Sequence, residues 1–171
     1  MAAKIVVTGG AGFIGSNIVQ RLAARGDADI VVCDWLGSAE DEKWRNLADC
    51  AIGDIVAPEA LFAYLDDHAG DVAAIIHMGA VSSTTERDVD LIVETNIRLS
   101  QRLWRWAAQR RRPFLYASSA ATYGDGAQGF RDDNAIEAVQ RLRPLNAYGW
   151  SKQVFDLYAL RETQRGAAPP P

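Results

Sequence analysis

The sequence has few of the residues that mark secreted, membrane-spanning or nucleic-acid-binding proteins. Its 171 residues include only two cysteines, Cys33 and Cys50, which form no Cys-x-x-Cys pair and no metal-type spacing. No apolar run approaches the length of a membrane span. Basic residues do not predominate, because 18 Lys and Arg stand against 22 Asp and Glu, for a net charge of -4. We therefore expect two reduced, buried thiols, no metal site, and no nucleic-acid or membrane partner.

The first residues run directly into an apolar segment, so no secretory signal is expected and the predicted location is the cytoplasm. We find no internal repeat. We expect a single dinucleotide-binding domain over residues 1–165, followed by a disordered Pro-rich tail over residues 166–171.

Apolar runs alternate with helical patterns along the chain. Strands are expected at residues 5–7, 30–33, 73–78 and 113–117, with a short third strand at Ala51-Ile52 that ends at Gly53-Asp54-Ile55. Helices are expected after residue 14, after Pro58, and over residues 89–110 and 147–163. Such alternation predicts parallel βαβ units, that is, an α/β protein with a Rossmann-type, doubly wound parallel sheet.

A glycine-rich loop lies between the first strand and the first helix: Thr8-Gly9-Gly10-Ala11-Gly12-Phe13-Ile14-Gly15. Gly9, Gly12 and Gly15 would let the backbone turn tightly and approach a pyrophosphate, whose charge the helix N-terminus favours. The alternative is that these glycines serve only the strand-to-helix turn. The strand–loop–helix context favours a phosphate site.

Asp34 ends the second strand about 20 residues after the loop, where a carboxylate can accept hydrogen bonds from the adenosine ribose. This position favours NAD over NADP, since a carboxylate repels a 2′-phosphate. Lys43 and Arg45 follow in a polar loop and can reverse the preference by contacting that phosphate. A solvated loop is an equally good interpretation of these two side chains.

Two further strand ends are candidates for cofactor contacts. Asp54 can accept from the adenine amino group and Ile55 can pack on the ring, although Asp54 also suits a helix cap ahead of Pro58. Met78, Gly79, Ala80, Val81 and Ser82 leave the fourth strand at the topological switch point, where small residues let the backbone lie along a cofactor. The hydroxyls of residues 82–85 also suit a turn and a cap, with Thr84 or Thr85 paired to Asp88. His77 is interpreted as a satisfied core histidine.

The strongest chemical pattern is Tyr148-Gly149-Trp150-Ser151-Lys152, which places a phenol and an ammonium on one helix face. A nearby cation favours the phenolate, so such a tyrosine can act as an acid or base. Ser118 and Ser119 leave the fifth strand at the carboxyl edge of the sheet, where a serine can hydrogen-bond a substrate oxygen.

These motifs resemble those of the extended short-chain dehydrogenases/reductases, the group that holds sugar-nucleotide epimerases and dehydratases. Three longer stretches closely resemble the ADP-glyceromanno-heptose 6-epimerase family, over nearly all the chain up to about residue 160. They are Gly79-Ala80-Val81-Ser82-Ser83-Thr84-Thr85-Glu86, Phe114-Leu115-Tyr116-Ala117-Ser118-Ser119-Ala120-Ala121-Thr122-Tyr123-Gly124 and Pro144-Leu145-Asn146-Ala147-Tyr148-Gly149-Trp150-Ser151-Lys152.

The resemblance implies an isomerase of lipopolysaccharide-core heptose synthesis. A bound NADP, with NAD as the alternative, would take a hydride from C6 of an ADP-heptose and return it to the other face. Ser119, Tyr148 and Lys152 would form the catalytic set. The cofactor-binding set would be Gly9, Gly12, Phe13, Ile14, Gly15, Asp34, Trp35, Lys43, Asp54, Ile55, Met78, Gly79, Ala80, Val81, Ser82, Asn96, Tyr148 and Lys152, with Lys43 facing the 2′-phosphate.

The chain also departs from the family. Trp35 stands where a small polar residue is common, and Pro58 replaces a lysine that can touch the cofactor. The family's sixth strand, second catalytic lysine and substrate domain have no counterpart here, so we expect a C-terminally truncated fold. The alternatives are a nucleotide-binding remnant without turnover, or another epimerase, dehydratase or reductase of the superfamily. The resemblance further implies a homo-oligomer through the helices at 89–110 and 147–163, and an unpaired fifth strand would also invite association.

Overall fold

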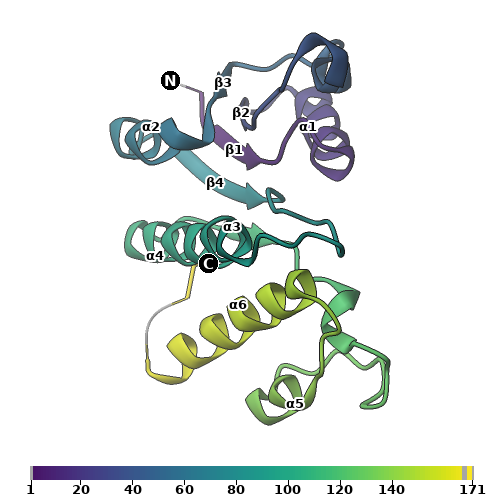
Figure 1. Cartoon of the computed structure of the whole chain (residues 1–171). Helices are drawn as coiled ribbons and strands as arrows, with labels where there is room; N and C mark the ends of the chain where they lie inside the picture. The colour runs from purple at the N-terminus through teal and green to yellow at the C-terminus, as the bar shows by residue number, and fades with distance from the viewer. Residues whose placement is uncertain (1, 167–168, 171) are drawn as a thin grey trace. The chain divides into compact units, whose positions relative to one another are not determined.

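A computed structural model describes residues 2–166 and 169–170. The chain divides into two compact units, one of Met1–Gly79 with Arg110–Tyr116 and the other of Ala80–Gln109 with Ala117–Pro171. Figure 1 shows the ribbon coloured along the chain. Residues 167, 168 and 171 of the tail expected to be disordered lie outside the described residues.

The first unit is built on a five-stranded parallel sheet. Its strands are β1 (Lys4–Thr8), β2 (Asp29–Cys33), β3 (Asp54–Val56), β4 (Val72–His77) and β5 (Phe114–Tyr116), in the order β3-β2-β1-β4-β5. The order runs outward from β1 in both directions, so the topological switch point lies between β1 and β4. The predicted Rossmann-type, doubly wound sheet is confirmed, and β5 forms one of its edges.

Alternating side chains bury both faces of this sheet. Val7, Ile30 and Val32 pack in one cluster with Val19 of α1 (Phe13–Arg25) and with Leu47 of a 3₁₀ segment, Lys43–Leu47. Their neighbours along the strands, such as Val6, Val31 and Ile75, point to the opposite face and are also fully buried. Two-sided burial is the reason that these strands are almost continuously apolar. The unit also contains 3₁₀ turns at Ala39–Asp41 and Pro58–Ala60, and α2 (Leu61–Asp67).

The third strand lies later in the chain than its sequence predicts. Strand β3 begins at Asp54, which pairs with Val31, and ends at Val56, which pairs with Cys33. The prediction that Asp54 ends this strand at the carboxyl edge is therefore wrong. Its alternative role as a helix cap is also wrong, because Ala57 precedes the Pro58–Ala60 turn and no side chain caps it. Two apolar residues carry too little periodicity to set the register of so short a strand.

The second unit consists of helices and loops. Residues 89–110 form α3 (Val89–Ile92), a π-helical segment (Val93–Arg98) and α4 (Leu99–Arg110). After a 3₁₀ turn at Ala120–Tyr123 come α5 (Ile136–Arg141) and α6 (Ala147–Gln164). The two long helices are confirmed, whereas the sequence did not predict the π-helical segment or α5.

Three aromatic side chains of α4 and α6 lie in the core. Trp104 meets Tyr158 edge to face and Phe155 stacks on the same ring, and Trp104, Trp106 and Phe155 are buried. Within the described chain, no helix is both long enough and apolar enough to span a membrane.

Candidate functional site

Two positions of the loop require glycine, because other backbone atoms lie too close to admit a Cβ. Gly9 has φ +65°, and a Cβ there would lie 2.6 Å from the backbone nitrogen of Gly79. A Cβ on Gly15 would lie 2.0 Å from the carbonyl oxygen of Gly9. Both residues therefore have a steric role in the loop, and phosphate binding stays a prediction beside it, since the same absence of side chains exposes the backbone.

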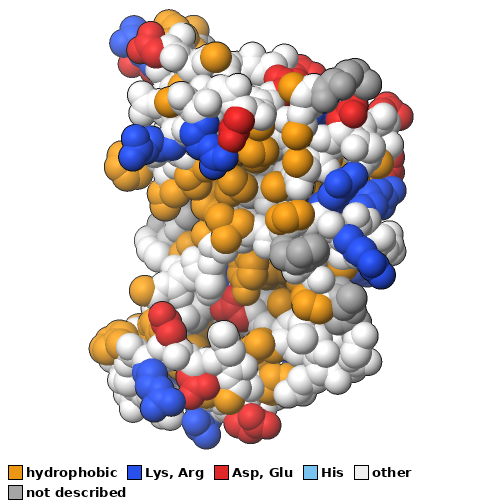
Figure 2. Space-filling model, turned by 180° about the vertical axis from the view of Figure 1, so that it is seen from behind, with side chains coloured by type: hydrophobic (Ala, Val, Ile, Leu, Met, Phe, Trp, Pro, Cys, Tyr) orange, Lys and Arg blue, Asp and Glu red, His pale blue; other side chains and the backbone are white. Residues whose placement is uncertain are grey.

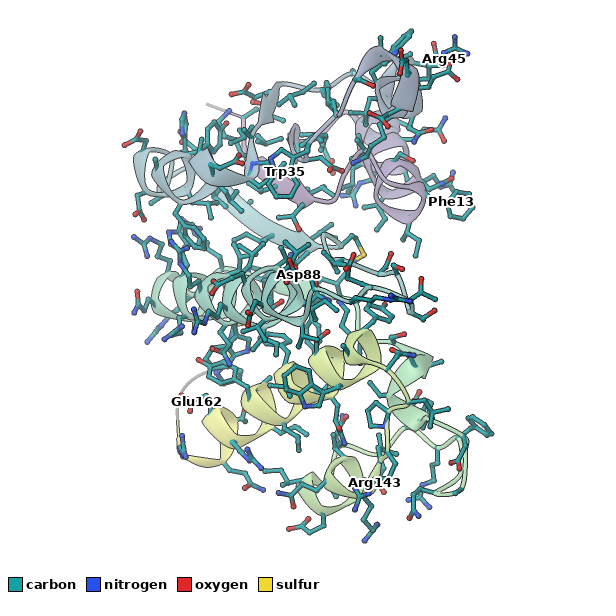
Figure 3. The ribbon with its side chains drawn as sticks, viewed as in Figure 1. Phe13, Trp35, Arg45, Asp88, Arg143 and Glu162 are labelled. Carbon is teal, nitrogen blue, oxygen red and sulfur yellow. The ribbon has the colours of Figure 1, made fainter. Side chains whose placement is uncertain are left out.

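The N-terminus of α1 is open to solvent. Gly12 is the N-cap, and no side chain caps this helix, so the N–H groups of its first turn can face an anion. Phe13 and Ile14 are 87% and 61% exposed, and Figure 3 shows Phe13 at the start of the helix. The loop thus leaves backbone N–H groups at the start of α1 without a side-chain cap, and a pyrophosphate contact there stays a prediction.

Thr8 connects the end of β1 to the segment that follows β4. Its hydroxyl oxygen accepts a hydrogen bond from the backbone N–H of Gly79 at 3.1 Å and lies 2.6 Å from Nδ1 of His77. The hydroxyl can therefore donate to that ring nitrogen. His77 is almost fully buried. Its interpretation as a satisfied core histidine is confirmed.

Asp34 binds both the glycine loop and Lys43. One carboxylate oxygen accepts from the backbone N–H of Ala11 at 2.9 Å, and the other accepts from the Lys43 ammonium at 2.8 Å. Lys43 also donates to the carbonyl oxygen of Trp35 at 2.6 Å. Arg45 instead pairs with Glu42 at 2.9 Å on an exposed surface (Figure 3). Lys43 is therefore held beside Asp34, and the solvated-loop interpretation applies only to Arg45.

Trp35 is held by a residue that the sequence did not single out. Its indole N–H donates to the carboxylate of Glu59, at 3.0 and 3.2 Å from the two oxygens, while the side chain stays 54% exposed. Glu59 follows Pro58 in the 3₁₀ turn. Burial, with the charges of Asp34 and Glu59, raises the pKa of the Cys33 thiol to about 12. Two carboxylates therefore act on the end of β2.

Asn46 and Asn96 are further positioning groups. Asn46 donates from its amide to the carbonyl oxygen of Ala11 at 2.8 Å, a contact that only the structure shows. Asn96 is fully buried in the π-helical segment, where it accepts from the Val81 N–H at 2.8 Å and donates to the Val81 carbonyl at 2.9 Å. It also donates to Ser151 at 3.0 Å. Asn96 thus fixes the backbone of Val81, and a direct contact with a cofactor stays a prediction.

The hydroxyl-rich segment after Val81 forms a turn. Ser83 and Thr85 hydrogen-bond to each other at 3.1 Å. The predicted cap at Thr84 or Thr85 is wrong, since Asp88 is itself the N-cap of α3 and accepts from the N–H of Leu91 at 2.9 Å (Figure 3). Ser82 is exposed.

Tyr148 and Lys152 lie one turn apart near the start of α6, which Asn146 caps by accepting from the Gly149 N–H at 2.8 Å. The Lys152 ammonium lies 5.9 Å from the centroid of the Tyr148 ring. Lys152 is 5% exposed, and burial lowers its pKa, with the charge of Asp156 acting in the opposite direction. A phenol beside a buried cation can exchange a proton with a substrate hydroxyl.

Ser119 lies close to this helix through its neighbours. Its hydroxyl oxygen accepts from the N–H of Ala121 at 3.1 Å, as the cap of the following 3₁₀ turn. A Cβ on Gly149 would lie 2.5 Å from the carbonyl oxygen of Ala121, so glycine is needed where α6 approaches this turn. The second unit therefore carries Ser119 on a turn that packs against α6, the helix of Tyr148 and Lys152, whereas the first unit carries the glycine loop, Asp34 and Lys43. Among the described residues, no group of three or more His, Cys, Asp or Glu side chains could hold a metal ion.

Comparisons with known proteins agree with this arrangement. A model of the NAD dependent epimerase/dehydratase family matches residues 5–168. The chain is 49% identical over 159 residues to an ADP-L-glycero-D-manno-heptose-6-epimerase of Nitratidesulfovibrio vulgaris (strain DP4), covering 92% of this chain and 48% of the relative. It is 41% identical over 160 residues to the protein of that name from Fusobacterium nucleatum, again covering 92% of this chain and 48% of the relative.

A solved structure shows the same fold. The Helicobacter pylori ADP-L-glycero-D-manno-heptose-6-epimerase superposes with a TM-score of 0.75 at 29% identity, over 94% of this chain and 51% of that chain. The chain thus spans about half the length of the relatives that it matches.

Proposed function

The chain belongs to the NAD dependent epimerase/dehydratase family, and we propose that it carries the dinucleotide-binding and proton-transfer parts of an ADP-heptose 6-epimerase. The observation that carries this proposal is the pair on α6, in which a buried Lys152 ammonium lies beside the ring of Tyr148. The identity to curated heptose epimerases supports the choice of an ADP-heptose as substrate.

The residues of the first unit suit a dinucleotide. Gly9 and Gly15 admit no Cβ, and the uncapped start of α1 offers backbone donors to the pyrophosphate. Asp34 has the position of a ribose ligand. When bound, the nicotinamide ring supplies the hydride acceptor and donor for C6 of the sugar. The chain's own residues then have to hold the dinucleotide and move the proton of the C6 hydroxyl.

That proton is assigned to Tyr148. The phenolate would take the proton of the C6 hydroxyl on one face of the sugar when that carbon is oxidised, and the phenol would give a proton back to the oxygen when the carbon is reduced on that face. Ser119 hydrogen-bonds the same oxygen, and the Lys152 ammonium stabilises the phenolate. The net redox change is zero, since the hydride is returned.

The dinucleotide is proposed to be NADP, with NAD as the alternative. The ammonium of Lys43 supports NADP, because it lies at Asp34 and can meet a 2′-phosphate. Asp34 and Glu59 favour NAD, since Asp34 follows β2 and the charge of Glu59, from the Pro58–Ala60 turn, also acts on the end of that strand. The competition between these charges makes the preference a measurable property of a few side chains.

We further propose that residues 1–165 act as one functional domain. This domain would work in the cytoplasm, in the synthesis of the lipopolysaccharide heptose. We also propose a homo-oligomer formed through the helices at 89–110 and 147–163. Association is supported by large apolar side chains exposed on these helices, namely Val89, Leu91 and Trp150. Figure 2 shows hydrophobic side chains at the surface of one face. The burial of Trp104, Trp106 and Phe155 removes them from this argument.

The test combines calorimetric titration of NADP and NAD with an assay of C6 inversion by NMR, using ADP-heptose and a Tyr148→Phe control. Heat with a dinucleotide and inversion that the control lacks would support the epimerase. Binding heat without inversion would favour the second candidate, a nucleotide-binding remnant without turnover. The match to only about half the length of the relatives supports this candidate. No heat with either dinucleotide would contradict both.

A further inference from the structure

A third side chain lies on the same face of α6 as Tyr148 and Lys152. Asp156 follows Lys152 by four residues, as Lys152 follows Tyr148, and residues spaced by four share a helix face. The Asp156 carboxylate accepts a hydrogen bond from the Ser118 hydroxyl, with 2.6 Å between Oγ and Oδ2. Ser118 directly precedes Ser119 in the chain.

We propose that Asp156 is a positioning residue, which binds Ser118 so that Ser119 is held near Tyr148, and which provides the counter-charge for the buried ammonium of Lys152. This role rests on the function proposed for Ser119, Tyr148 and Lys152. It concerns the free protein, so it can be tested without a dinucleotide.

The hydrogen bond from Ser118 has a defined place in the unit. The segment that carries Ser119 approaches α6 at two points, on either side of that serine. On one side the Ser118 hydroxyl donates to Asp156, and on the other the carbonyl of Ala121 lies against Gly149. With both neighbours held, Ser119 has little freedom to move along the helix. The two serines also differ in chemistry, because the Ser118 hydroxyl is committed to a carboxylate, whereas Ser119 is left for a substrate oxygen.

The charge of Asp156 acts on Lys152 through space. Burial disfavours the charged ammonium and lowers its pKa, and Asp156 is the charged group that opposes this shift. The aromatic ring of Tyr148 also lies near the ammonium, at 5.9 Å from its centroid. Without Asp156, a larger fraction of Lys152 would be neutral and unable to stabilise a phenolate.

The chain is well suited to a direct measurement, since Lys4, Lys43 and Lys152 are its only lysines. Labelling with [ε-¹³C]lysine gives three NMR signals, and Lys152→Arg assigns one of them. Asp156→Asn is expected to lower the pKa of Lys152 further, because it removes the charge that opposes the effect of burial. Asp156→Glu should restore most of the shift. Ser118→Ala keeps the carboxylate and should leave the pKa of Lys152 nearly unchanged.

A second readout tests the hydrogen bond. The Ala121 N–H, which donates to Ser119, should exchange with solvent several-fold faster in Ser118→Ala and in Asp156→Asn than in the wild type. Glu162→Gln removes a carboxylate from the same helix, one that pairs with Arg165 (Figure 3), and should change neither readout. If Asp156→Asn fails to fold, Ser118→Ala still decides the positioning role.

An unchanged pKa of Lys152 in folded Asp156→Asn would overturn the counter-charge role, and unchanged exchange of Ala121 in Ser118→Ala would overturn the positioning role. Both measurements use the free chain. Failure of the proposed epimerase, seen as absence of dinucleotide binding, is therefore distinguishable from failure of this inference.

Discussion

Replacing Lys43 with methionine should weaken the binding of NADP much more than the binding of NAD. Methionine keeps the length and the apolar stem of the side chain and removes only the ammonium. That ammonium lies 2.8 Å from Asp34 and 2.6 Å from the Trp35 carbonyl, so it is already held at the proposed ribose ligand, Asp34.

The size of the effect follows from the contacts. A 2′-phosphate carries about -1.5 to -2 charges, and a hydrogen bond to a charged group contributes about 1.5–3 kcal/mol. Lys43 is 35% exposed and shared with Asp34, so the lower half of that range applies. At about 1.4 kcal/mol per factor of ten, the affinity for NADP should fall roughly 10-fold to 40-fold. The affinity for NAD should change less than about threefold, since Asp34 still accepts from the ribose.

The assay is calorimetric titration of both dinucleotides against the wild type, Lys43→Met and Arg45→Met. The last variant is the matched control, because Arg45 carries the same charge in the same 3₁₀ segment but pairs with the exposed Glu42. It should alter the NADP-to-NAD ratio less than about twofold at 0.15 M salt. An equal loss for both dinucleotides in Lys43→Met, or a larger change in Arg45→Met, would refute the assignment of Lys43 to the 2′-phosphate.

Other side chains give equally direct tests. Glu59→Gln removes a carboxylate near Asp34 and should raise the NADP-to-NAD affinity ratio about threefold to tenfold by the same calorimetry, whereas an unchanged ratio would place Glu59 outside the field of the phosphate. Because the pKa of the Cys33 thiol is raised to about 12, almost none of this thiol is ionised at pH 8. Ellman's reagent should therefore modify this cysteine only after denaturation. Gly149→Ala puts a Cβ 2.5 Å from a backbone oxygen and should cost about 1–3 kcal/mol, seen as a lower Tm, whereas Gly70→Ala, with no atom within 4 Å, should be neutral. Burial lowers the pKa of Lys152 from 10.5, so the unfolded chain binds this proton more readily, and the stability contributed by this group rises with pH between the folded pKa and 10.5. Lys152→Met should therefore raise the Tm at neutral pH and remove this part of the pH dependence, which denaturation at several pH values would check.

Features set by local patterns were predictable from the sequence. The continuous apolar runs of β1, β2 and β4 reflect burial on both faces, and the 3.6-residue period of α6 places Tyr148 and Lys152 one turn apart whatever the surroundings. The glycine loop could be located because a strand and a helix flank it closely in the chain. Covalent spacing determines all of these relations, so the fold class and the chemical motif needed no tertiary information.

Strand register and π-helical geometry were not predictable in this way. Strand β3 is three residues long, and its register depends on pairing with β2 rather than on its own pattern. The π-helical segment that presents Asn96 to Val81 could not be recognised from the sequence. It is short, and its apolar residues fit the pattern of an ordinary α-helix equally well.

The chemical roles of equivalent side chains were also decided by tertiary contacts. Sequence alone treats Lys43 and Arg45 alike, and Ser118 and Ser119 alike. The structure separates the first pair, because Asp34 binds only Lys43, and the second pair, because Asp156 binds Ser118. The sequence by itself determined the strand–loop–helix order and the Tyr148–Lys152 spacing, since these depend on neighbours along the chain. Only the tertiary structure decided which of the two basic side chains and which of the two hydroxyls binds a carboxylate. The reason is that Asp34 lies 9 residues from Lys43 in the chain, and Asp156 lies 38 residues from Ser118.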